Sequence, residues 1–389
     1  MASLSRRMFM AGATLCGLLS STAYAADTVK IGLVLPMTGP FASTGRQVEA
    51  GVRAYMALNG DTVAGKKVEV VLRDDAGTAD QTRRIAQELV VKDGASILMG
   101  FGLTPLALSV APVLSQAKVP AIITSATTSA IMSKSDYYVR TSMAGPQSAV
   151  PVASWAAQNG LKRVVTLVSD YGPGIDIEKG FTDQFKKDGG EILEAVRVPL
   201  QNPDFAPFLQ RVRDTKPDAV FVFVPSGVGS LFMKQFVERG LREAGIRLIA
   251  TGDVTDDDLL NGMGDAALGV ITGHFYSAAH DSPENKAFVG EVRKSANNMR
   301  PNFMSVGGYD AMALAYAALK KTEGDTDGTK LVEAMKGMSW ISPRGPITID
   351  PKTRDIVQDI YMREVKKVDG ELYNVEFATF PKVRDPNTP

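Results

Sequence analysis

Hydroxyl side chains follow two apolar runs that are typical of buried parallel strands. Thr104 follows the run that ends at residue 100, and Ser125, Ala126 and Thr127 follow the next run. In an open parallel sheet, ligands bind at the carboxyl ends of the strands, where helix starts present unpaired N–H groups. These residues could therefore hold a carboxylate without an arginine. They could equally be ordinary helix N-caps.

The motifs of the common enzyme classes do not occur in this chain. It has two histidines, His274 and His280, and neither lies in a motif of a catalytic triad. No G-x-x-x-x-G-K-[ST] phosphate loop occurs, and residues 36–40 replace the glycine-rich turn of a dinucleotide site. Acidic runs such as 256–258 usually cap helices or face solvent. The sequence therefore predicts no catalytic residues, no metal and no cofactor.

The amino-acid composition excludes two further classes of protein, those that bind nucleic acid through a basic surface and those held together by disulfides. The chain of 389 residues has 43 basic and 43 acidic side chains, so it offers no basic surface for nucleic acid. Its hydrophobic fraction of 44% is that of a globular protein, and its length predicts two domains or one large one. Cys16 is the only cysteine, which excludes a disulfide framework. We expect a monomer.

Residues 1–25 are predicted to be a cleavable signal peptide. Arg6 and Arg7 form a positive start, residues 8–19 are apolar, and an A-x-A cleavage signal stands at 23–25. The apolar run is too short for a transmembrane helix, which needs roughly 20 residues. The paired arginines leave twin-arginine export open beside the ordinary route. Cleavage removes two arginines and no acid, which leaves a formal charge of about −2.

Strand-length apolar runs alternate with amphipathic helical patterns along the mature chain. We predict strands at 28–35, 67–73, 96–100, 121–124, 163–169, 192–198, 219–224, 247–250, 346–349 and 360–368. We predict helices at 48–59, 79–91, 175–187, 205–212, 229–240, 283–297 and 306–320. Two more helices are predicted, one that starts at residue 105 and one that ends at residue 159. Because parallel strands need helical crossovers, this pattern predicts two parallel sheets with helices on both faces.

Several stretches resemble one protein family. The segment Lys30-Ile31-Gly32-Leu33-Val34-Leu35-Pro36-Met37-Thr38-Gly39-Pro40-Phe41-Ala42, followed by Gly45 and Gly51, resembles the opening of the type I periplasmic binding proteins of branched-chain amino acid transport. Further stretches agree in order and spacing: Asp74-Asp75, Val119-Pro120, Asp170-Tyr171-Gly172-Pro173-Gly174, residues 266–270 and Tyr309-Asp310-Ala311. The resemblance covers nearly all of residues 28–365.

The resemblance implies an α/β fold of two doubly wound parallel-sheet lobes joined by a three-crossing hinge. We expect lobe I to comprise 26–145 plus 276–345, and lobe II 146–275 plus 346–389. It further implies that a small ligand closes between the lobes in the periplasm. The family delivers such ligands to the membrane permease subunits of an ABC transporter.

The resemblance also assigns the carboxylate side of the site. Thr104 falls where the family places a hydroxyl for the ligand carboxylate, and Leu103 beside it falls at an apolar wall. Ser125, Ala126 and Thr127 fall where backbone and hydroxyl groups complete that side.

The remaining positions concern the rest of the ligand. Thr44 and Ser226 replace aromatic residues of the leucine-binding member, which implies a pocket of altered size or polarity. Tyr171 matches an aromatic residue of the second lobe. Asp253 aligns with the acid that pairs the ligand ammonium, unless it caps the turn at 256–260. Further walls are expected from one of three aromatic residues: Phe275, Tyr276 and Phe303.

We therefore predict an extracytoplasmic solute-binding protein of an ABC importer that binds an amino acid, branched-chain or related. An amine-free small carboxylate, such as an aromatic acid, is the alternative ligand. Two alternative functions also stay open. A ligand-sensing module could use the same fold, and a secreted enzyme would need an acid or base with a perturbed pKa beside the cleft.

Overall fold

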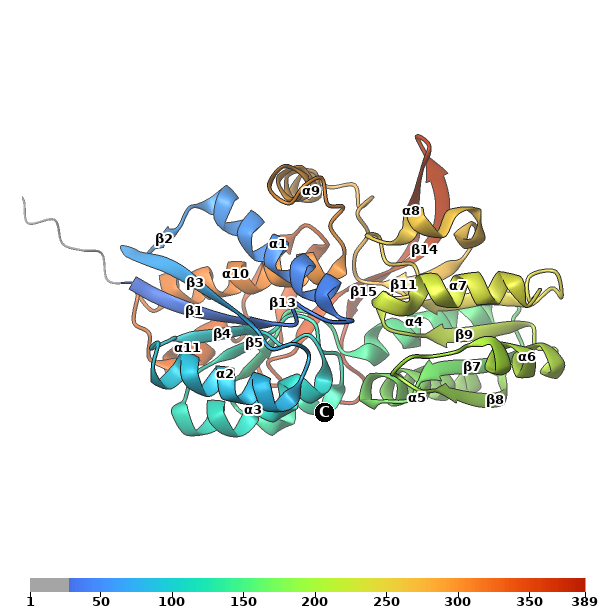
Figure 1. Ribbon diagram of the computed structural model, residues 1–389, viewed down its shortest axis with the longest axis horizontal. Helices are drawn as coiled ribbons and strands as arrows, with labels where there is room; N and C mark the ends of the chain where they lie inside the picture. Colours follow the sequence, from blue (N-terminus) through green and yellow to red (C-terminus); the bar gives the residue numbers. More distant parts are fainter. Residues whose placement is uncertain (1–27, 389) are drawn as a thin grey trace, which may run out of the picture.

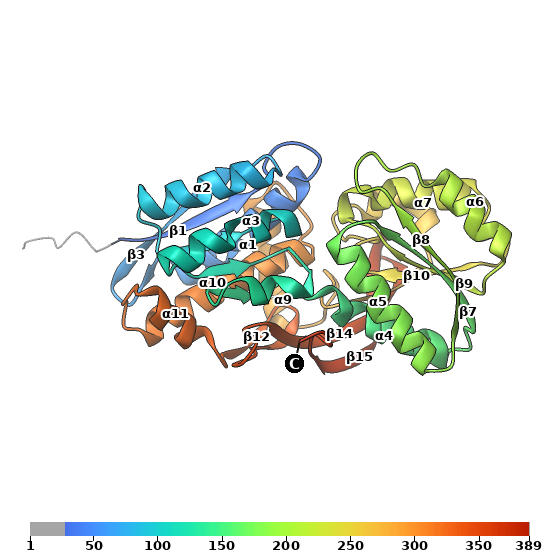
Figure 2. The ribbon, with the colours of Figure 1, turned by 90° about the horizontal axis from the view of Figure 1, so that it is seen from below.

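The chain folds into two α/β lobes that lie side by side. The computed structural model describes residues 28–388, and Figures 1 and 2 show the two lobes from perpendicular directions. Each lobe is built around its own sheet, which confirms the predicted fold class. The predicted signal peptide and Cys16 lie outside the described residues.

The first sheet has the strand order β2-β3-β1-β4-β5-β6. Its neighbours are parallel except for the short β2, which pairs antiparallel with β3. The strands are β1 (Thr28–Leu35), β2 (Thr62–Val63), β3 (Lys66–Asp74), β4 (Ile97–Gly100), β5 (Ala121–Ile123) and β6 (Tyr138–Arg140). The helices between them are α1 (Ala42–Asn59), α2 (Ala79–Val91), α3 (Thr104–Ala117) and the 3-10 turn η1 (Ser129–Lys134).

The second sheet has the order β12-β13-β14-β11-β10-β9-β7-β8, with β15 paired to β14. Its strands are β7 (Arg163–Ser169), β8 (Glu191–Val198), β9 (Ala219–Phe223), β10 (Arg247–Thr251), β11 (Ile271–His274), β12 (Ser339–Ser342), β13 (Gly345–Ile349), β14 (Ile356–Val368) and β15 (Glu371–Val383). Its helical segments are α4 (Gly145–Gln158), α5 (Gly172–Lys187), α6 (Ala206–Thr215), η2 (Ser226–Val228), α7 (Gly229–Glu238), α8 (Leu260–Met263) and η3 (Gly264–Ala267).

The second sheet is parallel in its first five strands, as predicted, and antiparallel in the strands that the chain adds last. Strands β8, β7, β9, β10 and β11 are parallel, whereas β12 to β15 pair antiparallel. The reason is that these last strands follow one another through short turns. Hairpins of this kind can only give antiparallel pairs.

The chain passes between the two sheets three times within residues 28–388, at 141–144, 275–282 and 336–338. Between the second and third crossings it forms α9 (Pro283–Ser295), α10 (Phe303–Lys321) and α11 (Gly328–Met335), which cover the first lobe. The expected lobe boundary at residue 345 falls inside the hairpin of β12 and β13. This hairpin hydrogen-bonds to the second sheet, yet Trp340 and Ile349 pack against the first core, so its assignment to a lobe remains a proposal.

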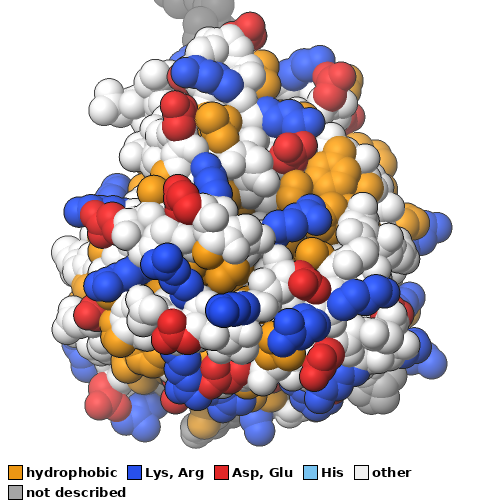
Figure 3. Space-filling model, turned by 90° about the vertical axis from the view of Figure 1, so that its right-hand side faces the viewer, with side chains coloured by type: hydrophobic (Ala, Val, Ile, Leu, Met, Phe, Trp, Pro, Cys, Tyr) orange, Lys and Arg blue, Asp and Glu red, His pale blue; other side chains and the backbone are white. Residues whose placement is uncertain are grey.

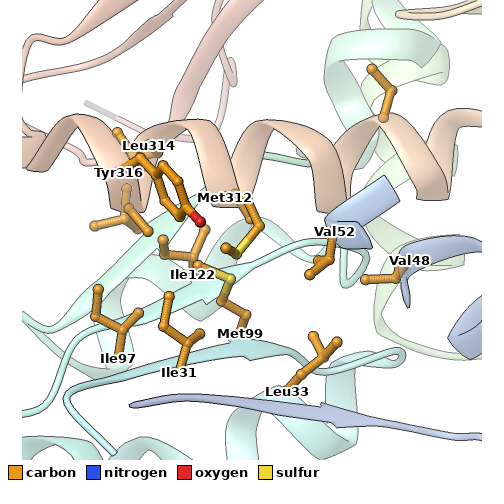
Figure 4. Packing of buried hydrophobic residues seen from close by; sticks show 14 of the residues in the cluster. Ile31, Leu33, Val48, Val52, Ile97, Met99, Ile122, Met312, Leu314 and Tyr316 are labelled. Carbon is orange, nitrogen blue, oxygen red and sulfur yellow. The ribbon is translucent and has the colours of Figure 1, made fainter. Parts of the chain in front are cut away.

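Helix α10 is the centre of the largest hydrophobic core. It is buried nearly all round, and Figure 4 shows Met312, Leu314 and Tyr316 packed above the side chains of β1, β4 and β5. Helix α1 approaches α10 closely at Gly51, where a Cβ atom would overlap the carbonyl oxygen of Ser305. The two helices together fix the position of the α10 N-terminus beside the second lobe.

The end face of the second lobe carries interspersed basic and acidic side chains with small apolar areas between them (Figure 3). Within the described part of the chain, from residue 28 to 388, none of the helices combines the length and apolar character needed to cross a bilayer.

Candidate ligand-binding site

A cleft of about 450 Å³, including its part open to solvent, lies between the lobes. It is built at the carboxyl ends of strands from both sheets, because β4, β5, β7, β9 and β10 all end beside it. Such edges are where open α/β sheets bind ligands. The lining residues are Phe41, Thr44, Gly102, Leu103, Thr104, Ser125, Ala126, Thr127, Tyr171, Pro173, Phe223, Pro225, Ser226, Gly227, Asp253 and Met304.

The first lobe presents hydroxyl groups to the cleft. Thr104 begins α3, and its Oγ1 lies 2.9 Å from Oγ1 of Thr128. Ser125 donates its hydroxyl to the carbonyl of Gly102 at 3.1 Å and lies 3.0 Å from the sulfur of Met304. These contacts fix the two hydroxyls at adjacent loops, beside the positive end of the α3 dipole. This side can donate to a carboxylate.

The N-cap alternative does not describe these hydroxyls. Leu103 holds the N-cap position of α3, and Thr128 holds that of η1. Neither helix start has a side-chain cap hydrogen bond from a described residue. The hydroxyl of Thr104 is instead directed to Thr128, in the loop after β5.

The second lobe supplies aromatic and acidic groups. Tyr171, at the N-cap of α5, stacks on Phe223 with ring centroids 6.1 Å apart and an interplanar angle of 17°. Burial, reinforced by the charge of Asp253, raises the pKa of the Tyr171 hydroxyl, which therefore stays protonated. Ser226 begins η2 and faces the same space.

Asp253 is the only charged residue among the described residues that line the cleft. Its Oδ2 has no hydrogen-bond partner within residues 28–388 and lies 3.8 Å from Nε2 of His274, beyond hydrogen-bonding distance. His274 is fully buried, with ring centroids 4.5 and 4.4 Å from those of Phe275 and Phe303. Burial lowers the pKa of His274 to about 4, so the ring is neutral near pH 7.

A buried cation lies behind this acid. Arg363 on β14 donates to Oγ1 of Thr272 at 3.1 and 3.2 Å and to the carbonyl of Tyr276. Its guanidinium lies against the backbone of Gly252, where a Cβ atom could not be accommodated. Its charge interacts with Asp257, at 3.9 Å, and with Asp253. The charge of Asp253 is therefore partly balanced from inside the protein.

Of the twelve residues selected from the sequence, Phe275 and Phe303 pack against the buried ring of His274 and do not line the cleft. The structure brings nine to this one cleft: Thr44, Leu103, Thr104, Ser125, Ala126, Thr127, Tyr171, Ser226 and Asp253. It does not bring Tyr276 there. The hydroxyl of Tyr276 donates to Oδ1 of Asn285 at 3.0 Å, and its ring packs near Phe288. The reason is that the chain leaves the second sheet after His274 and crosses to α9, which turns Tyr276 into the first core.

Sequence reasoning missed several lining residues, notably Phe41, Phe223 and Met304. Phe223 is the last residue of β9, so its position at a strand end was a usable signal. Phe41 lies inside the stretch that carries the family resemblance. Met304 gave no local signal, because the start of α10 reaches the cleft only through tertiary packing.

A search for metal sites among residues 28–388 finds no cluster of three or more His, Cys, Asp or Glu side chains. In the acidic run 256–258, Asp256 and Asp257 are buried and accept hydrogen bonds from the side chains of Asn302 and Asn374. The chemistry that the arrangement supports is the binding of a small molecule between hydroxyl donors on one lobe and an acid on the other.

Known proteins share this architecture. A solute-binding protein of an ABC transporter from Rhodopseudomonas palustris BisB5, solved with 3,4-dihydroxybenzoic acid, is 59% identical, with a TM-score of 0.90 over 92% of this chain and 99% of that one. One from R. palustris HaA2, solved with p-hydroxybenzoic acid, is 43% identical, with a TM-score of 0.90 and the same coverage. The Leu/Ile/Val-binding protein homolog 6 of Brucella melitensis is 48% identical over 95% of both chains.

The family model described as periplasmic binding protein matches residues 28–371. This span includes both sheets up to β14 and all the residues that line the cleft. The fold, the cleft between the lobes and the match over most of the length agree, and they confirm the resemblance seen in the sequence. The chain belongs to the periplasmic binding protein family.

Proposed function

We propose that this protein is the solute-binding component of an ABC importer and that it binds a small carboxylic acid between its lobes in the periplasm. The relatives solved with ligand carry the name of such a component and cover nearly the whole chain. Binding without turnover, export through the predicted signal peptide and delivery to permease subunits belong to the same proposal.

The observation that carries this proposal is the polarity of the cleft. No lysine or arginine is among its described lining residues, so a ligand carboxylate must be held by neutral donors. Thr104 and Thr127 provide these on the first lobe, and Ser125 becomes a third donor when its proton turns from the carbonyl of Gly102 to the ligand. Across the cleft, the unpaired Oδ2 of Asp253 requires a donor from the ligand, because a buried acceptor without a partner is costly.

Two ligand classes bring a carboxylate and a donor. In an amino acid the donor is the ammonium group, as predicted from the sequence, and the Brucella relative carries a Leu/Ile/Val-binding name. In a hydroxylated aromatic acid the donor is a phenol, as in the ligands of the two R. palustris proteins.

We favour the hydroxylated aromatic acid for two reasons. Arg363 already balances part of the charge of Asp253, so a neutral hydroxyl donor suffices there. Apolar and aromatic walls from Tyr171, Phe223 and Leu103 suit a ring. The amino acid remains the second candidate.

Isothermal titration calorimetry of the mature protein with 3,4-dihydroxybenzoate, 4-hydroxybenzoate, benzoate, leucine and valine tests the proposal. We expect the hydroxylated benzoates to bind more tightly than benzoate and than either amino acid. Tight leucine binding without benzoate binding would select the second candidate. No binding by any of the five acids, with folded protein confirmed by circular dichroism, would contradict the proposal.

A further inference from the structure

A buried polar contact joins the two lobes directly behind the cleft. Asp256, in the loop after β10, is 3% exposed and accepts from Nδ2 of Asn302 at 2.9 and 3.0 Å. Asn302 is the N-cap of α10, and its Oδ1 accepts from the N–H groups of Met304 and Ser305 at 2.9 and 3.2 Å. One amide side chain therefore fixes both the start of α10 and a loop of the second lobe.

This contact reaches the cleft from both sides. Met304, two residues after Asn302 in the chain, lines the cleft from the first lobe, and Ser226 lines it from the second lobe. The hydroxyl of Ser226 favours the charged form of Asp256, although it does not reach the geometry of a hydrogen bond with it. The contact between Asp256 and Asn302 thus lies close to one lining residue from each lobe, Ser226 and Met304.

A second hydrogen bond joins the two lobes close to this contact. Ser43 of α1 donates its hydroxyl to Oδ2 of Asp258 at 3.2 Å. Asp258 is only partly buried, whereas Asp256 is almost completely enclosed. Both acids accept a hydrogen bond from the other lobe, and only Asp256 is sealed from water. Asp258 therefore serves as a matched control for Asp256.

Burial raises the pKa of Asp256 to about 7, even though Asn302, Ser226 and the N–H of Asp258 favour the charged form. Two charged groups act on Asp256: Asp258 on the same loop, whose charge also raises the pKa of Asp256, and Arg363 on β14. Asp253 and Asp257 stand in the same loop, Arg300, which acts on Asp257, lies two residues before Asn302, and His274 at the end of β11 is neutral near pH 7. If separation of the lobes breaks the bond to Asn302 and admits water to Asp256, its pKa returns toward the ordinary value of 3.8.

We propose that Asp256 is a positioning residue of the binding site that takes up a proton when the lobes close on the ligand and releases it when they open. The inference rests on the proposed function and adds a coupling between ligand affinity and the pH outside the cytoplasm. Asp256 acts through Asn302 and Ser226.

The direction of the coupling follows from linkage. Because the closed form holds the proton more tightly, protonation favours closure, and this advantage is lost as the pH rises through about 7. If the open form has the ordinary pKa, the dissociation constant rises by up to about 30-fold between pH 5.5 and pH 8.0. Closure takes up the most protons at about pH 5.4, midway between the two pKa values, and most of this uptake remains at pH 6.0.

The test is calorimetry of the mature protein with 3,4-dihydroxybenzoate and, in parallel, leucine, from pH 5.5 to 8.0. For whichever acid binds, we expect affinity to fall by more than about fivefold over this range, toward the 30-fold limit. Repeating the titration at pH 6.0 in buffers of different ionisation enthalpy should show a proton taken up. The Asp256→Asn variant keeps an oxygen for Asn302 and should lose the fall in affinity with rising pH. The buried His274 does not mask this result, because hydration of its ring on opening would make affinity rise, not fall, with pH.

Two variants and one spectroscopic measurement serve as controls. Asp258→Asn should keep the pH dependence, and so should His280→Gln, which removes the imidazole paired with Glu376 at 2.9 Å. If Asp256→Asn does not fold, carboxyl-carbon NMR of the wild-type protein should give Asp256 a pKa at least two units higher with ligand than without.

Three outcomes would overturn the inference. They are a dissociation constant that is constant with pH, a fall in affinity with rising pH that survives Asp256→Asn, and equal pKa values of Asp256 with and without ligand. If neither acid binds at any pH, the proposed function fails and the inference fails with it.

Discussion

Asp253 and Thr104 stand on opposite lobes and offer opposite hydrogen-bonding roles to a ligand. Thr104 can donate, and the carboxylate of Asp253 can only accept. A ligand with an acid at one end and a donor at the other has one favourable orientation in such a cleft. Two substitutions separate these roles.

Replacing Asp253 by alanine tests the accepting role. In the wild-type protein the hydroxyl of 4-hydroxybenzoate should contribute about 1.5–3 kcal/mol relative to benzoate, because it donates to a charged acceptor. In Asp253→Ala this preference for 4-hydroxybenzoate over benzoate should fall below about 0.5 kcal/mol. The two proteins and the two acids form a double-mutant cycle that isolates the contact between Asp253 and the ligand hydroxyl. Calorimetry with both acids measures it, and an unchanged preference would place the hydroxyl elsewhere. If leucine is the ligand, Asp253→Asn should cost about 2–5 kcal/mol.

Replacing Thr104 by valine tests the donating role at nearly constant volume. The loss of one hydroxyl should weaken benzoate and 4-hydroxybenzoate equally, by about 1–3 kcal/mol, because both carry the carboxylate. Calorimetry on the same two acids gives the comparison, and the melting temperature without ligand controls for folding. A loss confined to the hydroxylated acid would show that the ligand lies the other way round.

At the residue scale, the rule that ligands bind at strand ends selected Thr104 and the loop 125–127, which line the cleft. The family resemblance supplied the other candidates, among them Tyr171 and Asp253, which also follow strand ends, and Thr44, which lies inside α1. It gave no reason to exclude Tyr276, because only the structure shows that β11 is followed by a crossing to the other lobe. The environment of Asp256 could not be read from sequence, since Asn302 reaches it from a distant segment.

Among the elements, the packing of α1 on α10 positions Met304 at the cleft and the buried Asn302 next to it in the chain. Gly51 permits this packing, because a methyl group there would overlap the carbonyl of Ser305. Gly51→Ala should therefore lower the free energy of unfolding by about 1–3 kcal/mol or more. Gly290→Ala in α9, where a Cβ meets open space, should be neutral or stabilising by up to about 1 kcal/mol. Urea unfolding of both variants checks this, and equal midpoints would contradict the packing account.

Most of the elements could be predicted from hydrophobic patterns, and the exceptions have two different causes. Strands β1, β7 and β9 are buried on both faces and read as continuous apolar runs. Strand β15 was missed because it lies at an exposed position and mixes polar with apolar residues, so its pairing with β14 decides its structure. Strand β11 is only four residues long and gave too short a pattern.

For the whole molecule, three crossings and a shared cleft imply a hinge. Contacts that cross between the lobes close the cleft in this structure, including Ser43 to Asp258 and the N–H of Ser129 to Asp176 at 3.0 Å. Solution scattering should show a smaller radius of gyration with saturating 3,4-dihydroxybenzoate than without it. Identical profiles in the two states would argue against closure.

The central claim is that the cleft holds a small carboxylic acid with its acid toward the first lobe and its donor toward Asp253. A crystal structure of the mature protein grown with 3,4-dihydroxybenzoate tests this most directly. The account predicts the carboxylate within hydrogen-bonding distance of Thr104 and the loop 125–127, and a ring hydroxyl within the same distance of Asp253. A ligand bound outside the cleft, or one with its carboxylate against Asp253, would contradict it.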